Sequence, residues 1–214
     1  MHLLSAQAGA ILDGSEPVDL AQSPGEIVVL SAADTEINAL AHARRELGDE
    51  VPSLRLANLS HLSHNYSIDL YLENTLCRAR LIILRLMGGP SYWRYGLDEL
   101  MALARGRGIH LAVMPGDHRP DPALEGCSNL PEDQVNRLWA YMVEGGPSNM
   151  QNLLHYCAHI LNGAPAPAPA RPLPQALYYW PGEKIPGLEE IRQHWIKNAP
   201  IAPIIFYRAI LQAA

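Results

Sequence analysis

Residues 26–48 read EIVVLSAADTEINALAHARRELG, and this stretch decides the fold class. It begins with the short apolar run Ile27 to Ala32, which is typical of a strand buried on both faces. Asp34 follows in a position suited to capping a helix, and Gly48 can end that helix. One face of the predicted helix carries the apolar residues Ile37, Leu40, Ala41 and Leu47. A buried strand that leads directly into an amphipathic helix predicts the start of a parallel α/β layer.

The alternation of strand and helix continues along the chain. Further short apolar runs predict strands at Ser53 to Asn58, Arg80 to Met87, Ile109 to Met114 and Pro203 to Ile210. Helical spacing between the first four strands predicts helices that begin at Ser67 and near Leu97. The second strand alternates apolar and polar residues, which suits a sheet edge. We therefore predict an α/β fold with a flavodoxin-like, doubly wound parallel sheet in the order 2-1-3-4-5, in preference to the Rossmann order.

After the fourth strand the pattern changes to consecutive helices. One is expected from Pro131 to Gly145 and the next from Ser148 to Gly163, which together predict a helical hairpin beside the sheet. Residues 164–174 read APAPAPARPLP and predict an extended spacer on the order of 34 Å long. The expected organisation is an α/β head domain over 1–163, a Pro-rich linker and aromatic loop over 164–186, and over 187–214 the helix Leu188 to Ile196 and a strand that opens a further, truncated domain. Alternatively, that last strand closes the first sheet as a fifth strand.

Composition excludes several classes of protein. The chain has 214 residues, of which 48% are hydrophobic, so a sizeable core is expected without disulfides. The net charge of -6 disfavours nucleic-acid binding, and the 3 cysteines are too far apart for a zinc motif. No apolar run is long enough for a membrane span, and a cytoplasmic location is expected. The sequence contains neither a phosphate-binding P-loop nor a G-x-S-x-G elbow, which argues against ATP hydrolysis and serine chemistry in this chain.

Ligands of open parallel sheets bind at the carboxyl ends of the strands. This rule selects the segments that follow the first four strands, and it gives the candidate substrate-binding residues Asp34, Asn58, Arg85, Gly88, Gly89, Tyr92, Trp93 and Asp117. The segment from Met87 to Gly96 is the richest, because its glycines permit a sharp turn and its aromatic rings could stack on a flat conjugated ligand. The alternative is a Gly-Gly turn whose aromatic side chains plug the end of the sheet.

Arg85 and the histidines are the charged and metal-ligating residues that could have either a structural or a functional role. Arg85 lies within an apolar strand, so it requires a partner, either a protein carboxylate such as Asp34 or Asp117 or a ligand carboxylate. The histidine pairs His61 and His64, and His155 and His159, have spacings compatible with a metal site. The second pair falls opposite the apolar face of its helix and is expected to face solvent or a partner. We assign no metal ligand and no catalytic residue to this chain.

Several motifs, in chain order, resemble the amino-terminal part of the large subunits of the CobN family of aerobic cobaltochelatases, which are similar to magnesium chelatases. They are Val18 to Gly25, Leu30 to Glu36, Pro52 to Leu59, Arg85 to Gly89, Tyr92 to Gly96, Pro115 to Asp117, Glu144 to Asn149 and Phe206 to Arg208. The resemblance extends through nearly the whole chain, which makes it far more specific than any single motif.

This resemblance implies ATP-dependent insertion of cobalt into hydrogenobyrinic acid a,c-diamide during adenosylcobalamin synthesis. In the family the large subunit holds the tetrapyrrole and the metal, and the partners are two other subunits that include an AAA-type ATPase. Cobalt and ATP are thus implied for the complex, with no cofactor in this chain. Family large subunits are several times longer, so we expect the catalytic residues to lie outside this fragment. The fragment is expected to be inactive alone and to contribute tetrapyrrole capture or, as an assembly module, subunit contacts. A magnesium chelatase relative is the other alternative.

Overall fold

The computed structural model describes residues 16–172, 176–181 and 186–205. Its core is a four-stranded sheet in the order β2-β1-β3-β4. The strands are β1 (Ile27–Ser31), β2 (Leu54–Asn58), β3 (Leu81–Leu86) and β4 (His110–Pro115). All neighbouring strands run parallel, and β2 lies at one edge. The α/β fold class, the order of the first four strands and the edge position of the second strand are therefore confirmed.

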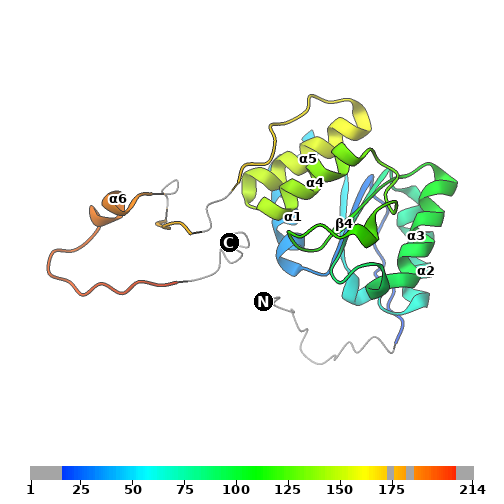
Figure 1. Ribbon diagram of the computed structural model, residues 1–214, viewed down its shortest axis with the longest axis horizontal. Helices are drawn as coiled ribbons and strands as arrows, with labels where there is room; N and C mark the ends of the chain where they lie inside the picture. Colours follow the sequence, from blue (N-terminus) through cyan, green and yellow to red (C-terminus); the bar gives the residue numbers. More distant parts are fainter. Residues whose placement is uncertain (1–15, 173–175, 182–185, 206–214) are drawn as a thin grey trace.

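Helices cover both faces of the sheet (Figure 1). One face packs against α2 (Asn65–Asn74) and α3 (Arg94–Arg107), and the other packs against α1 (Asp34–Leu47), α4 (Glu132–Glu144) and α5 (Pro147–Asn162). Successive strand residues alternate between the two cores, because side chains on a strand point to opposite faces: Val28 belongs to the first core and Val29 to the second. Short 3-10 helices lie at Gly48–Glu50, Leu59–Leu62, Leu76–Arg78, Pro90–Trp93 and Pro122–Leu124.

The helical hairpin is formed by α4 and α5, as expected, and one contact fixes its direction. The guanidinium of Arg80, just before β3, donates to the carbonyl oxygen of Leu161 and to Oδ1 of Asn162. Helix α5 therefore ends near the amino end of the sheet and begins near the carboxyl end. No helix among the described residues is long and apolar enough to cross a membrane.

Helices α4 and α5 begin one residue from their expected starts, at Glu132 and Pro147, and the starts of three further helices also differ from those expected. Asp34 is the first residue of α1 and not its cap, because Ala33 occupies the cap position and Ser31 Oγ accepts the N–H of Ala33. Helix α2 begins at Asn65 and not at Ser67, since the His64 side chain accepts the N–H of Tyr66. Helix α3 begins at Arg94 and not near Leu97, because the 3-10 turn before it continues directly into the helix.

The carboxyl-terminal expectations are met only in part. The expected helix from Leu188 is present but short, as α6 (Leu188–Arg192). Residues 203–205 form no strand, contrary to the expectation, and 206–210 lie outside the described residues. The outer edge of β4 is already occupied, because Asn129 bonds to Ile109 and Leu111 and the Ser128 hydroxyl bonds to Val113. A fifth strand therefore finds no free backbone groups along this part of the edge.

Candidate functional site

The candidate residues gather at the carboxyl end of the sheet. Asn58 at the end of β2 donates from Nδ2 to Asp34 Oδ1 at 2.7 Å, which joins the loops after β1 and β2. The Asn58 side chain also accepts the N–H of Ser60 at 2.9 Å. Both side chains therefore have partners inside the protein, and their first role is to hold the shape of this rim.

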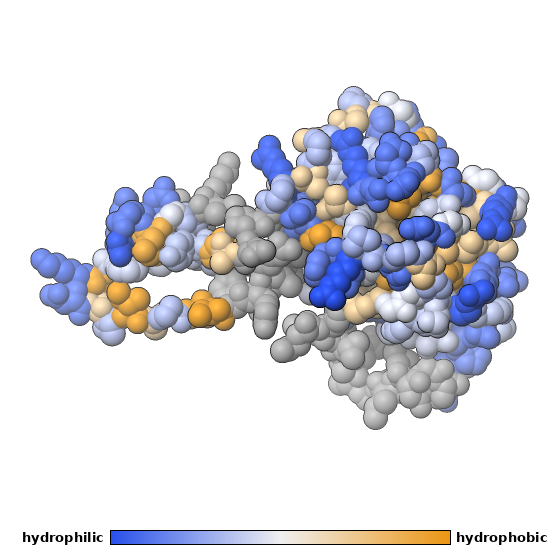
Figure 2. All heavy atoms as spheres, in the orientation of Figure 1, coloured by the Kyte–Doolittle hydropathy of each residue, from blue (hydrophilic) through white to orange (hydrophobic). Residues whose placement is uncertain are grey.

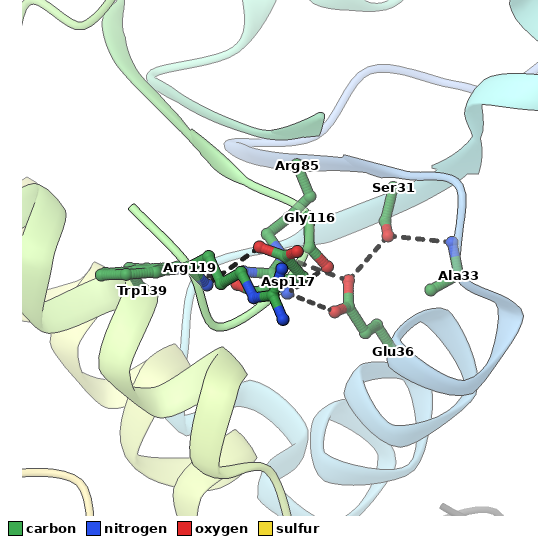
Figure 3. A network of polar contacts seen from close by, with 8 residues as sticks. All are labelled: Ser31, Ala33, Glu36, Arg85, Gly116, Asp117, Arg119 and Trp139. Carbon is green, nitrogen blue, oxygen red and sulfur yellow. Dashed lines mark hydrogen bonds and ion pairs between the residues drawn. The ribbon is translucent and has the colours of Figure 1, made fainter. Parts of the chain in front are cut away.

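Arg85 is paired with Glu36, a residue that the sequence analysis did not select (Figure 3). Nη2 of Arg85 lies 2.7 Å from Glu36 Oε1 and 3.0 Å from the carbonyl oxygen of Gly116, and Nε lies 3.4 Å from Glu36 Oε2. Ser31 donates its hydroxyl to the same carboxylate at 2.7 Å. The Arg85 side chain is 3% exposed and that of Glu36 17% exposed. Of the two kinds of partner expected for Arg85, a protein carboxylate is the one present, but neither Asp34 nor Asp117 supplies it.

The geometry of α1 explains why Glu36 is the partner of Arg85. Glu36 stands in the first turn of this helix, where the turn directs its side chain back over the carboxyl end of the sheet. Asp117 is used differently, since its carboxylate accepts the N–H of Arg119 and its carbonyl accepts Trp139 Nε1 at 3.0 Å (Figure 3). Glu36 could have been identified from the sequence, because it is an acidic residue in the first turn of the helix that follows β1, and β1 is the neighbour of the strand that carries Arg85.

The glycine doublet makes the turn that the sequence predicts. Gly88 and Gly89 have φ angles of +88° and +76°, a region that side chains rarely adopt. Gly116, after β4, approaches the same loop so closely that a Cβ there would lie 2.9 Å from the backbone nitrogen of Met87. The loops after β3 and β4 are therefore packed together, around a cavity of about 190 Å³ whose lining includes Gly88, Asp117 and Asp121.

The aromatic residues after the doublet divide into two kinds. Trp93 is buried, donates from Nε1 to the Leu62 carbonyl at 2.7 Å, and covers Gly96, where a Cβ would lie 2.2 Å from its ring. Trp93 thus plugs the end of the sheet, and its ring is not available for stacking on a ligand. Tyr92 is 59% exposed and Tyr95 37% exposed. These two tyrosines therefore form the exposed aromatic surface of this rim.

A cavity of about 350 Å³, here called the tyrosine cleft, opens between the starts of α2 and α3. It is lined by Leu59, Ser60, Ser63, Asn65, Ile68, Tyr92, Trp93, Arg94, Tyr95 and Gly96. The Tyr95 hydroxyl donates to Asp69 at 2.7 Å, and this hydrogen bond raises the pKa of Tyr95 to about 12. The lining offers aromatic, amide and hydroxyl groups and one guanidinium, but no carboxylate. Such a surface can bind a ligand, but it holds no acid or base poised for proton transfer near neutral pH.

A larger cavity of about 510 Å³ lies between β4 and α4. It is lined by apolar residues that include Val113, Leu130 and Trp139, and by the acidic residues Asp121, Glu125 and Glu132. Sequence reasoning missed this space, because the loop and the helix that form its walls are joined only by the tertiary fold.

Metal-ligating side chains do not converge in the part of the chain that the structure describes, where no group of three His, Cys, Asp or Glu residues could hold an ion. His64 serves as the cap of α2. His159, which was expected to face solvent or a partner, instead stacks on Tyr156 with ring centroids 5.5 Å apart and lies 2.6 Å from the carbonyl of Ala164. Its contacts are therefore internal.

Comparison with known proteins finds similarity along the whole chain. No family model matches the sequence. The whole chain aligns with the aerobic cobaltochelatase subunit CobN of a Sinorhizobium species at 44% identity over 223 residues, and with that of Pseudomonas aeruginosa at 41% identity over 215 residues. By sequence, the chain is similar to a part of CobN. The resemblance that the motifs indicate is thus confirmed. The chain spans 17% of the length of each of these CobN relatives.

A solved structure supports the fold. The catalytic subunit of cobaltochelatase from Mycobacterium tuberculosis matches 72% of this chain with a TM-score of 0.57, at 21% identity and over 12% of its own length. At this identity the match concerns the fold alone. It agrees with the parallel α/β architecture described above, in which the motifs Leu30 to Glu36, Arg85 to Gly89 and Pro115 to Asp117 lie at the carboxyl ends of the strands.

Proposed function

We propose that this chain acts as part of the large subunit of a cobaltochelatase, which inserts cobalt into hydrogenobyrinic acid a,c-diamide with ATP hydrolysed by a partner subunit. The observation that carries the proposal is the 41–44% identity to CobN over the entire chain. Both curated relatives are named as cobaltochelatase subunits, which favours cobalt over the magnesium chelatase alternative. The cytoplasm, where ATP is available, is the compartment that this role requires.

Within that subunit, we assign to the tyrosine cleft a contact with the corrinoid substrate. The substrate is a large conjugated ring with carboxylate and amide side chains. Tyr92 offers an exposed aromatic face at the mouth of the cleft, and aromatic faces bind flat conjugated rings by stacking. Arg94 lines the same cleft and uses Nε for Asp98, at 2.7 Å, so its remaining N–H groups are the natural partners of a substrate carboxylate.

This role is binding and orientation, without chemistry at the metal. Cobalt insertion needs a base that removes pyrrole protons and a site that strips water from the cation. The cleft contains no such base, and the described residues contain no cluster of metal ligands. We therefore place proton removal and metal delivery in other parts of the subunit, and ATP hydrolysis in the AAA-type partner.

Titration of the purified chain with hydrogenobyrinic acid a,c-diamide tests the contact. Trp93 forms one wall of the cleft, so binding is expected to quench tryptophan fluorescence in a saturable manner. The absorption spectrum of the corrinoid provides a second signal that does not depend on the protein's own chromophores. No change in either signal at high micromolar ligand would remove the capture role.

A matched pair of variants locates the contact. Tyr92→Ala is expected to weaken binding by roughly fivefold or more, because truncation of an aromatic contact residue costs more than about 1 kcal/mol. Tyr178→Ala is the control, since Tyr178 is 51% exposed and does not line the cleft. Equal effects of the two substitutions would show that the ligand binds elsewhere.

A second candidate function, an assembly module, has its own supporting observation. The arm that follows α6 carries exposed large apolar side chains, which Figure 2 shows as hydrophobic patches on the extended part of the molecule. They include Ile196, Ile201, Ile204 and Ile205. Exposed apolar surface of this kind is typical of protein contacts.

Capture of the two partner subunits by the immobilised chain tests the assembly function. If the arm mediates the contact, Ile204→Asp with Ile205→Asp is expected to abolish capture, while Tyr92→Ala leaves it unchanged. The reverse pattern would assign subunit contacts to the cleft and would argue against a corrinoid there.

A further inference from the structure

The proline-rich segment lies along the α4–α5 hairpin instead of extending freely from it (Figure 1). We call residues 164–171 the strap. Its exposure follows a period of three: Ala164, Pro167 and Ala170 are half-buried, and the residues between them are exposed. A polyproline II helix has three residues per turn, so one edge of such a helix is in contact along the whole strap. Ala170 packs against the core of this face.

Aromatic side chains of the hairpin form the surface beneath the strap. Tyr141 and Tyr156 have ring centroids 6.2 Å apart, and His159 stacks on Tyr156. The guanidinium carbon of Arg137 lies 4.6 Å from the centroid of the Tyr156 ring. Tyr141 is 0% exposed and Tyr156 4% exposed. We call these four residues, together with Asn149, the hairpin groove.

Two groove side chains donate hydrogen bonds to carbonyl groups of the strap. The Tyr141 hydroxyl donates to the carbonyl of Ala168 at 2.5 Å, and Arg137 donates to the carbonyl of Pro167. His159 Nδ1 lies 2.6 Å from the carbonyl of Ala164. Carbonyls are the polar groups that a proline-rich backbone retains, because proline has no N–H. The groove thus presents donors where a polyproline II ligand presents acceptors.

Asn149 fixes the far end of the strap. Its Nδ2 donates to the carbonyl of Arg171 at 2.9 Å, and its Oδ1 accepts the N–H of Arg171 at 2.9 Å. Asn149 lies in the first turn of α5, near the carboxyl end of the sheet, whereas Ala164 lies just past the other end of that helix. The strap therefore runs antiparallel to α5 and ends near the carboxyl end of the sheet.

We propose that the hairpin groove is a recognition site for polyproline II peptides and that the strap is its resident ligand in the same chain. Aromatic rings that contact a preformed polyproline II helix, with side-chain donors directed at its carbonyls, are the general means by which proline-rich segments are bound. The short tether holds the strap at an effective concentration on the order of millimolar, so modest intrinsic affinity is enough to keep the groove filled.

The test uses the full chain with Pro165, Pro167 and Pro169 each replaced by glycine. This variant keeps the length and the carbonyl groups but loses the preformed backbone, so the strap is expected to leave the groove. Hydrogen exchange at the Arg171 amide should then accelerate by roughly tenfold or more. In the control variant, glycine replaces Pro181, Pro200 and Pro203, which are exposed prolines outside the strap. This variant should leave hydrogen exchange at the Arg171 amide unchanged.

Binding of a synthetic peptide of residues 164–171 is the second test. Added to the triple-glycine chain, it is expected to bind saturably and to shift the NMR signals of Tyr141 and Tyr156, while a peptide with glycine in place of proline should not. Peptide binding identifies the groove as the site. Unchanged exchange at Arg171 together with no peptide binding would overturn the proposal and make the segment a plain spacer.

A milder variant keeps the proposal testable if the triple-glycine chain fails to fold. Tyr141→Phe removes only the hydroxyl that donates to Ala168. Its expected effect is a fall in the NMR order parameters of residues 165–169 with the order parameters of β1 unchanged. Order parameters below about 0.6 for the strap of the unmodified chain would contradict a docked segment from the outset. None of these measurements depends on chelatase function.

Discussion

At the scale of single residues, the ion pair between Arg85 and Glu36 is the most consequential contact at the rim. It places a charge on a fully buried strand and holds the start of α1 and the loop after β4 against it. Nη1 of Arg85 is the one buried side-chain nitrogen or oxygen without a hydrogen-bond partner among the described residues. The guanidinium therefore depends on Glu36 for its neutralisation.

Glu36→Gln should consequently destabilise the protein strongly. The amide preserves the shape of the side chain but leaves the buried guanidinium without a counter-charge, which costs about 3 kcal/mol of the free energy of unfolding. Urea denaturation measures this difference. Glu73→Gln on the exposed face of α2 is the control and is expected to have little effect. Equal stability of the two variants would mean that the ion pair contributes nothing.

Glu26 should contribute stability that depends on pH. The backbone N–H of Ser53 and the guanidinium of Arg80, the latter at 3.0 Å, lower the pKa of Glu26 below its ordinary value of 4.5. A carboxylate whose pKa is lower in the folded state stabilises the fold above its unfolded pKa, and this contribution is lost as the pH falls through the folded value. The wild-type protein should thus exceed Glu26→Gln in stability at neutral pH, with the difference shrinking below pH 4.5. Denaturation at several pH values measures the difference in stability between the two proteins. A difference that does not change with pH would contradict the role assigned to Glu26.

At the scale of elements, side chains form hydrogen bonds with the outer edge of β4, where a further strand would otherwise pair. Asn129 satisfies the N–H of Leu111 and the carbonyl of Ile109, and its own N–H bonds to the carbonyl of Leu111. An edge covered in this way offers no template for pairing with another chain.

Asn129→Ala should therefore lower stability by about 1 to 2 kcal/mol, the net value of the side-chain hydrogen bonds that it removes. Thermal unfolding measures the loss. Asn74→Ala, at an exposed position at the end of α2, should leave the melting temperature nearly unchanged. A variant at Asn129 that is as stable as the control would show that water replaces the edge cap without cost.

The local pattern of apolar residues predicted which segments form helices and strands, but it predicted the first residues of the helices less accurately. The glycines Gly48, Gly145 and Gly163 follow the last residues of α1, α4 and α5, as their positive φ angles require. The starts of α2 and α3 were expected two to three residues too late. Short 3-10 turns and a histidine cap precede those helices, and neither has a distinctive sequence pattern.

At the scale of the whole molecule, the carboxyl-terminal arm is independent of the sheet. Ile204 and Ile205 are 82% and 95% exposed, and the edge of β4 is occupied by Ser128 and Asn129. Replacement of both isoleucines by serine should accordingly leave the melting temperature of the domain unchanged and improve solubility. Calorimetry and light scattering measure these effects. A lower melting temperature would show that the arm packs on the domain.

The amino-acid sequence by itself determined the parallel α/β sheet, the order of its first four strands, the hairpin and the similarity to CobN, because these follow from local periodicity and from motifs read in chain order. It also required a partner for Arg85. Only the tertiary structure decided that Glu36 is that partner, that Trp93 is buried while Tyr92 is exposed, and that the proline-rich strap lies in the hairpin groove. Each of these depends on side chains distant in sequence that meet in space, and the periodicity of a single segment carries no information about what packs against it.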